Sequence, residues 1–445
     1  MEGKLPNTKR ALMGLQHLFA MFGATILVPL LTGLSVQVTL VAVGVGTLIF
    51  HFMAKGKVPV FLGSSFAFMV GIRLITDPEM GPFAGEGLSQ AEMLSYATGA
   101  IMVAGLLYLV LAMVVKFAGV EKFMKFLPTV VTAPTVILIG VMLAPFAINM
   151  AGSNWLLALV TLGIILVVSC WAKGMVKIIP ILLGIAGAYV IALIGHFVFD
   201  LEWLNFAATT AAIEEPLYGI VGTPPFMAPR FALVPILIML PFALATIAEH
   251  IADMVILKRL SGKDFIKDPG LSRTLVGDGL ATIFGGWIGG PATTTYSENV
   301  GVVALTKIFD AGVLIFAAIY AVILGFSPLF ASVIYSIPDA IIGGASFVLY
   351  GMIAAVGIRN LIEEKVDLSD MKNTIIVSVM LVTGLGLRFG NPITFNIGDT
   401  MVPIDRLGVA IAIILGIILN LILPSAKKDD EEKPKASLKQ KKARA

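Results

Sequence analysis

Long apolar runs separated by short polar loops dominate the chain. A helix needs about 20 consecutive apolar residues to cross the hydrocarbon layer of a bilayer. Such runs predict twelve conventional transmembrane helices, near residues 11–33, 36–54, 92–115, 124–147, 154–172, 177–198, 231–257, 271–288, 311–325, 328–355, 370–387 and 404–424. The pattern is that of an all-α polytopic membrane protein.

Two further apolar segments, 58–73 and 293–307, are too short and too rich in Gly, Ser and Thr to face lipid as ordinary helices. Both open with residues that favour extended structure, V-P-V-F in the first and T-T-T-Y in the second. Extended backbone at membrane depth must be satisfied by other protein groups or by water. We expect the two segments to form short strands that pair with each other. Each would then continue as a half-helix, from Phe66 and from Glu298.

Composition supports the membrane interpretation, because 58% of the 445 residues are hydrophobic, 13% are charged and the mean hydropathy is +0.96. A single cysteine, Cys170, excludes an intramolecular disulfide. The four histidines form no pair at metal-ligand spacing, so we expect neither a metal nor a cofactor. No small-residue cleavage site follows the first apolar run, and the first helix is expected to be retained.

Positive charge is distributed unevenly over the predicted loops. With fourteen segments, 19 of the 31 Lys and Arg residues fall on one side. The other side receives Arg73, Arg230, Arg388 and Arg406, and the remaining eight follow Pro424. The positive-inside rule then places both termini in the cytoplasm of a multi-pass protein of the cytoplasmic (inner) membrane. Thirteen segments would not fit this distribution.

A weak internal repeat links the two halves. The run L-P-T-V-V-T-A-P from Leu127 resembles I-P-D-A-I-I-G-G from Ile337, and Pro128 and Pro338 are 210 residues apart. A repeat of seven segments must place its second copy upside down, as in many secondary transporters. That plan predicts a binding site at the short Gly-interrupted segments of the two halves.

Ionisable residues in the apolar segments point to the same place. Each costs roughly 3 kcal/mol or more at membrane depth, so a substrate or ion site is the default interpretation. Glu249 lies deep in its predicted helix. Glu298 could instead cap a helix N-terminus, which is worth about 0.3–1 kcal/mol, but its neighbours Asn299 and Gly301 and the low charge fraction favour function.

Several neighbours could contribute to this site. Asp253 shares the helix face of Glu249, so we expect it at or beside the site. His250 points about a quarter turn away and is equally well explained as a packing residue. Phe66 and Tyr296 could stack on a flat ligand. P-loop, G-x-G-x-x-G, H-E-x-x-H and nucleophile-elbow motifs are absent from the sequence, which argues against a nucleotidase, a protease or an ATP-driven pump.

Four motifs together resemble the nucleobase-ascorbate transporter family, also called nucleobase-cation symporter family 2. E-N-V-G at Glu298, followed by T-K at Thr306, is similar to the family signature. L-Q-H-L-F-A-M-F-G-A-T from Leu15, G-K-V-P-V-F-L-G-S-S-F-A-F from Gly56 and A-E-H from Ala248 also match. The resemblance covers nearly the whole chain apart from the tail.

The resemblance implies fourteen segments in two inverted seven-segment repeats, with short antiparallel β-strands in segments 3 and 10. Residues 1–118 (segments 1–4) and 230–326 (segments 8–11) would form a core domain. Residues 119–229 (segments 5–7) and 327–425 (segments 12–14) would form a gate domain. The charged tail, 426–445, is expected to be disordered in the cytoplasm.

The resemblance also implies roles for individual residues. Glu249 and Glu298 would accept hydrogen bonds from the N–H groups of a base. The other expected positions are Phe66 for stacking, Ala24 for a helix contact, Tyr296 and Ser297 for backbone contacts, Asn299 for tying segments together and Tyr350 for the gate. Two positions depart from the family pattern. Asp253 stands where a histidine is found, and Ser297 stands where a glycine is found, so a proton path through that histidine cannot be transferred unchanged.

Glutamate at the first signature position resembles the uracil carriers of the family. The expected function is therefore proton-coupled uptake of uracil by alternating access, with uracil, a proton and the lipid bilayer as partners. A xanthine or uric acid permease is the alternative within the family, and a channel or an integral-membrane enzyme are the alternatives outside it. We expect no catalytic residues and no nucleic acid. A homodimer is left open.

Overall fold

The computed structural model describes residues 5–79, 81–120, 122, 128–214, 219–390, 393–397 and 400–424. The expected disordered tail, 426–445, lies outside this part of the chain. The described part is mostly helical, with the bounds α1 (Asn7–Thr32), α2 (Val36–Met53), α3 (Phe66–Ile75), α4 (Gln90–Ala118), α6 (Thr129–Met142), α7 (Ala144–Ala151), α8 (Trp155–Trp171), α9 (Pro180–Phe199), α10 (Ala207–Glu214), α12 (Leu233–Ser261), α13 (Leu271–Trp287), α14 (Ser297–Thr306), α15 (Ala311–Gly325), α16 (Pro328–Tyr335), α17 (Asp339–Glu363), α18 (Met371–Phe389) and α19 (Gly408–Ile422).

Within the described residues, eight helical spans are long and apolar enough to cross a membrane, and a ninth results if α15 and α16 count as one span bent by 83°. The prediction of one helix over 328–355 is wrong, because α16 ends at Tyr335 and α17 begins at Asp339. Pro338 stands at the break with extended backbone and caps α17. A proline disfavours helical backbone in the residue before it. The count of fourteen segments stays a prediction.

Large apolar side chains remain exposed on the outer faces of several helices. Phe117, Trp171, Phe197 and Leu421 are each 66–82% exposed. A water-soluble protein would not leave so many large apolar groups uncovered. Together with the long apolar helices, they identify a multi-pass membrane protein.

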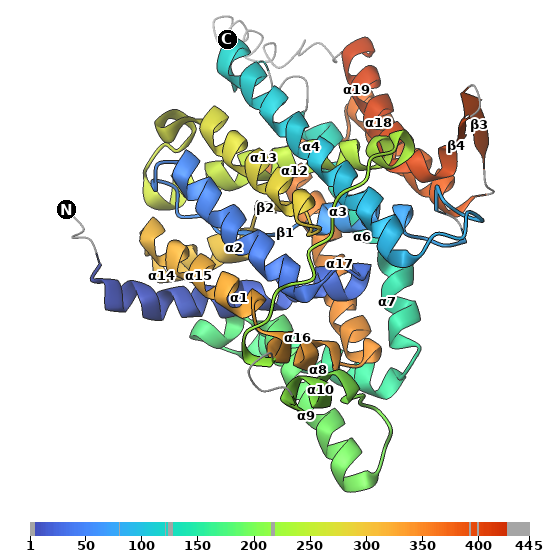
Figure 1. The fold of residues 1–445 in the computed structure, drawn as a ribbon. Helices are drawn as coiled ribbons and strands as arrows, with labels where there is room; N and C mark the ends of the chain where they lie inside the picture. Colours follow the sequence, from blue (N-terminus) through green and yellow to red (C-terminus); the bar gives the residue numbers. More distant parts are fainter. Residues whose placement is uncertain are drawn as a thin grey trace, which may run out of the picture.

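Two short strands, β1 (Leu62–Ser64) and β2 (Thr293–Thr295), pair in the middle of the molecule (Figure 1). Their pairing is antiparallel, with Gly63 opposite Thr294. This confirms the prediction of two short antiparallel strands followed by half-helices. The first half-helix, α3, begins at Phe66 as expected, and the second, α14, begins at Ser297, one residue earlier than expected.

Side chains of the surrounding helices hold the strand pair in place. The Thr47 hydroxyl of α2 accepts a hydrogen bond from the Leu62 N–H at 3.0 Å. The Ser64 hydroxyl donates to the Thr25 carbonyl of α1 at 3.0 Å, and the Thr282 hydroxyl of α13 donates to the Thr293 carbonyl at 2.8 Å. Backbone groups that strands this short leave unpaired are thus satisfied inside the protein, as membrane depth requires.

Small residues set the closest helix contacts. A Cβ at Gly286 of α13 would lie 2.6 Å from the Thr98 carbonyl oxygen of α4. A Cβ at Gly140 of α6 would lie 2.7 Å from the Tyr350 carbonyl oxygen of α17. Helices can approach this closely only where one of them lacks a side chain. The helices α6 and α17 begin directly after Pro128 and Pro338, the residues that suggested the repeat, and the full inverted repeat stays a prediction.

Candidate substrate-binding site

The strand pair directs two helix N-termini toward the middle of the molecule. Beyond the strands, the Tyr296 N–H donates to the Phe61 carbonyl at 3.1 Å, and the Ser65 N–H donates to the Ala292 carbonyl at 3.0 Å. α3 and α14 start directly after these contacts. The first turn of a helix has N–H groups without helical partners and carries partial positive charge. The two N-termini can therefore donate hydrogen bonds to a polar ligand.

Helix α12 brings acidic residues to the same region, because it packs against α3, β2 and α14. Glu249 lies on α12 and is exposed, although its helix is long and apolar. Asp253, one turn later, is 2% exposed. The two carboxylates share a helix face, as expected, but Glu249 is accessible and Asp253 is packed inside.

His250, the residue next to Glu249, belongs to a buried polar network. Its Nε2 lies 2.8 Å from the Thr274 hydroxyl, which itself donates to the Leu271 carbonyl, so Nε2 is the donor. Its Nδ1 lies 2.9 Å from the Asp278 Oδ2, and both side chains are fully buried. This contact is an ion pair when the imidazole is protonated, and neither Asp278 oxygen makes a hydrogen bond with the described residues.

This network joins three elements of the site. Asp278 is on α13, His250 is on α12, and the Thr295 hydroxyl of β2 lies 3.4 Å from the His250 Nδ1. A second buried contact ties α12 to α4, where the Tyr108 hydroxyl meets the Thr246 hydroxyl. Glu249 is thus carried by a helix that polar contacts fix on two sides.

The aromatic and amide residues of the expected site occupy different environments. Phe66 is half-buried and opens α3. Tyr296 is 4% exposed, and its ring fills the space beside Gly63, where a Cβ would come within 2.5 Å of three ring atoms. Asn299 is fully buried, and its amide makes no hydrogen bond with the described residues. Its expected role in tying segments together therefore stays a prediction.

For three of the expected site residues, the structure describes only the backbone. Ala24 lies within α1, and Ser297 and Glu298 are the first two residues of α14. Their side chains lie outside the described part of the structure. Tyr350 of α17 is buried and lines a separate pocket with Arg73 of α3.

Asp278 was missed by sequence reasoning, although a signal was present. It is the one carboxylate in the predicted helix 271–288, and an acid at that depth marks a functional or paired residue. Its partner could not be inferred, because His250 is 28 residues away on another helix. Thr246 and Tyr108 gave no comparable signal.

Comparison with known proteins agrees with this architecture. The family model Xan_ur_permease, described as Permease family, matches residues 8–393. The uracil permease of Bacillus subtilis (strain 168) is 40% identical over 436 residues, covering 94% of this chain and 93% of the relative. The probable uracil permease of Haemophilus influenzae is 37% identical, covering 95% and 96%.

A solved structure shows the same fold at low sequence identity. The transmembrane domain of a cyanobacterial bicarbonate transporter, BicA, aligns with a TM-score of 0.58 at 16% identity, covering 94% of this chain and 98% of that domain. The similarity extends over essentially the whole domain, so the two proteins share a fold. By sequence match over most of its length, this chain belongs to the nucleobase-ascorbate transporter family.

Proposed function

We propose that the protein takes up uracil together with a proton across the cytoplasmic membrane by alternating access. Glu249 and Glu298 accept hydrogen bonds from the two ring N–H groups of the base. N–H groups at the starts of α3 and α14 donate to its carbonyls, and Phe66 stacks on its ring. Ala24, Tyr296 and Ser297 complete the contacts with the base.

The observation that carries this proposal is the antiparallel β1–β2 pair, with a half-helix after each strand and α12 packed beside it. Broken segments of this kind form the ion and substrate sites of secondary transporters. Uracil has both N–H donors and carbonyl acceptors, so it suits a site with carboxylates and free helix N–H groups. The names of the related permeases favour uracil over xanthine or uric acid.

Proton coupling rests on the acidic residues of α12 and α14. Asp253 and His250 support the protonation of Glu249 and Glu298, Asn299 ties the segments together, and Tyr350 contributes from the gate. The core domain, residues 1–118 and 230–326, moves against the gate domain, residues 119–229 and 327–425. The protein spans the membrane fourteen times as two inverted repeats, with both termini in the cytoplasm.

Uptake by the purified protein in liposomes tests the function. We expect saturable accumulation of labelled uracil that a protonophore abolishes, with thymine, xanthine, hypoxanthine and uric acid as competitors. Non-saturable flux without counterflow would indicate a channel, and chemical conversion of the base would indicate an enzyme. Uptake of xanthine or uric acid without uracil would support the alternative within the family.

A substitution tests the site itself. We expect Glu298→Gln to lose the charged acceptor and to weaken uracil binding by roughly 10- to 150-fold, the equivalent of about 1.5–3 kcal/mol. Glu363→Gln, at the exposed end of α17, is the matched control and should bind normally. Isothermal titration or scintillation proximity would measure both, and unchanged affinity in Glu298→Gln would refute the assignment.

A further inference from the structure

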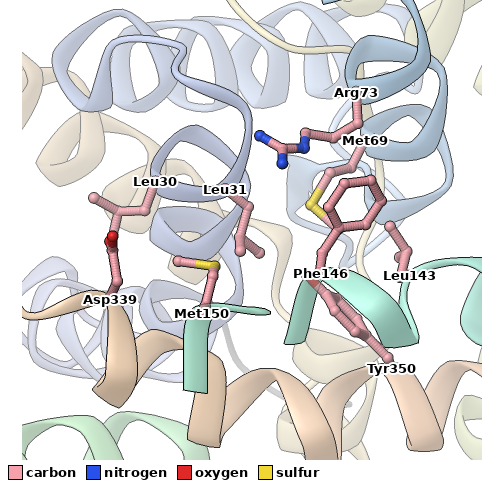
Figure 2. A pocket seen from close by; sticks show the side chains of 9 residues that line it. All are labelled: Leu30, Leu31, Met69, Arg73, Leu143, Phe146, Met150, Asp339 and Tyr350. Carbon is pink, nitrogen blue, oxygen red and sulfur yellow. The ribbon is translucent and has the colours of Figure 1, made fainter. Parts of the chain in front are cut away.

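A pocket of about 230 Å³ lies between α1, α3, α7 and α17 (Figure 2). α1 and α3 form one of its walls, and α7 and α17 form the other. In the proposed domain division these walls belong to the core and to the gate. The side chains that matter for recognition are those of Leu31, Met69, Arg73, Phe146, Asp339 and Tyr350.

Arg73 supplies a positive charge to this pocket. Figure 2 shows its guanidinium directed inward, and its Cζ lies 4.5 Å from the centroid of the Phe146 ring. The carboxylate of Asp77, four residues later in the chain, interacts electrostatically with this guanidinium. A guanidinium has five N–H donors, so the half-buried Arg73 side chain can interact with Asp77 and still donate to a ligand.

Polar groups from α17 face the same space. The Tyr350 residue is 3% exposed, and its hydroxyl lies beside the hydroxyl of Ser346. Ser346, one turn earlier, donates its own proton to the Ile342 carbonyl at 2.8 Å. Asp339, the first residue of α17, is exposed and lies across the pocket from Arg73 in Figure 2.

These groups define the chemistry of a ligand. A guanidinium and a hydroxyl can donate to ring carbonyls, a carboxylate can accept from a ring N–H, and Met69 and Phe146 offer apolar surface to a flat face. The volume is below the ~300–1,000 Å³ of pockets for drug-sized molecules. It therefore suits a single-ring heterocycle rather than a larger or purely apolar compound.

The pocket is also connected to the proposed site by one helix. Phe66 and Arg73 are about two turns apart on α3, or about 10 Å along its axis. By the positive-inside rule, Arg73 lies on the outer side. We propose that this pocket is an outer binding site, where a pyrimidine base held by Arg73 stops before it moves along α3 to Phe66. This inference rests on the proposed function.

Protection of an introduced cysteine tests occupancy directly. In a Cys170→Ser background, Met150→Cys places a thiol on the pocket wall. We expect uracil to slow the reaction of this thiol with a small maleimide. The same protection should be seen when Glu249→Gln and Glu298→Gln have removed the carboxylates of the proposed site beside the strands. Adding Arg73→Gln should abolish this protection. Protection that disappears with the two glutamate substitutions, or that survives Arg73→Gln, would overturn the proposal.

Transport kinetics separate recognition from a purely mechanical role of Arg73. We expect Arg73→Gln to raise the KM for uptake by roughly tenfold, with kcat nearly unchanged and partial rescue by Arg73→Lys. Arg388→Gln, which removes an arginine outside the pocket, is the matched control. If Arg73→Gln and Phe146→Leu lowered kcat equally and left KM unchanged, the Arg73–Phe146 contact would serve the conformational change of the protein. It would then not be part of a binding site.

Failure of this inference can be told apart from failure of the proposed function. If the unaltered chain accumulates uracil but uracil protects no cysteine in the pocket, the outer site is wrong and the transport proposal stands. If the unaltered chain neither accumulates uracil nor shows protection, both fall. A labelling measurement on purified protein does not depend on transport, so a variant that folds but does not transport remains informative.

Discussion

Three acidic or basic side chains near the proposed site differ sharply in their surroundings. Glu249 is exposed on an apolar helix, whereas its neighbour His250 is fully buried against Asp278. An exposed carboxylate can exchange protons and ligands with water, whereas a buried carboxylate is costly unless a polar or charged partner lies beside it. Glu249 is therefore suited to binding, and the His250–Asp278 pair is suited to fixing the helix that carries it.

Breaking this pair should destabilise the protein. Removing one partner leaves the other group buried without compensation, which costs about 3–5 kcal/mol. We expect Asp278→Ala and His250→Ala each to lower the free energy of unfolding by about this amount. The double variant should lose less stability than the two single variants added together, with a coupling free energy of about 0.5–3 kcal/mol. Denaturant unfolding of the purified protein in detergent measures the cycle.

An exposed ion pair offers the control for this cycle. Lys57 and Asp268 are 45% and 69% exposed at a distance of 2.6 Å. Surface pairs contribute about 0–1 kcal/mol, so Asp268→Ala should change stability little. Strict additivity of the His250 and Asp278 substitutions would show that the two side chains do not depend on each other.

At the scale of elements, the strands and half-helices of the site could be read from the sequence. Short runs rich in Thr, Val and Gly stood out against long apolar helices, and membrane depth leaves extended backbone few ways to be satisfied. The break between α16 and α17 was missed, because the polar stretch from Ser336 to Asp339 is short and the apolar run from 328 resumes directly after it. Only Pro338 signalled it, and proline also occurs inside α1 and α12 of this chain.

Gly63 makes the β1–β2 pairing compatible with the ring of Tyr296. A Cβ at position 63 would lie 2.5 Å from three ring atoms, and the ring is enclosed. We expect Gly63→Ala to destabilise the protein by about 1–3 kcal/mol, the usual cost of overpacking, and to impair uracil binding by displacing Tyr296. Thermal unfolding and equilibrium binding of the same preparation would measure both effects.

Gly163 provides the comparison for this substitution. It lies within α8, and a Cβ there would meet no atom within 4 Å. Alanine is the better helix former by about 1 kcal/mol, so Gly163→Ala should be neutral or slightly stabilising. If the two substitutions had equal effects, the close approach at Gly63 would not be the cause.

At the scale of the whole molecule, contacts between distant segments were beyond the reach of sequence patterns. The pocket beside Arg73 combines side chains from α1, α3, α7 and α17, and the Asp278 contact joins α13 to α12. Hydrophobic periodicity reports which face of a helix is buried, but it does not report which helix covers that face. The pairing of the two strands could be predicted from the sequence, whereas Arg73 was expected only as a loop residue of the outer side.

The proposed division into core and gate makes a prediction about the contact between α1 and α9. An ideal Cβ at Gly23 of α1 would lie 3.5 Å from the Ile181 Cβ of α9, and disulfides join Cβ atoms about 3.5–4.5 Å apart. In a Cys170→Ser background, Gly23→Cys with Ile181→Cys should therefore form a disulfide under mild oxidation. Because α1 would belong to the core and α9 to the gate, the bond should stop uracil uptake in liposomes until a reductant is added. Either cysteine alone should be insensitive to oxidation, and undiminished uptake by a fully cross-linked protein would mean that these two helices do not move apart during transport.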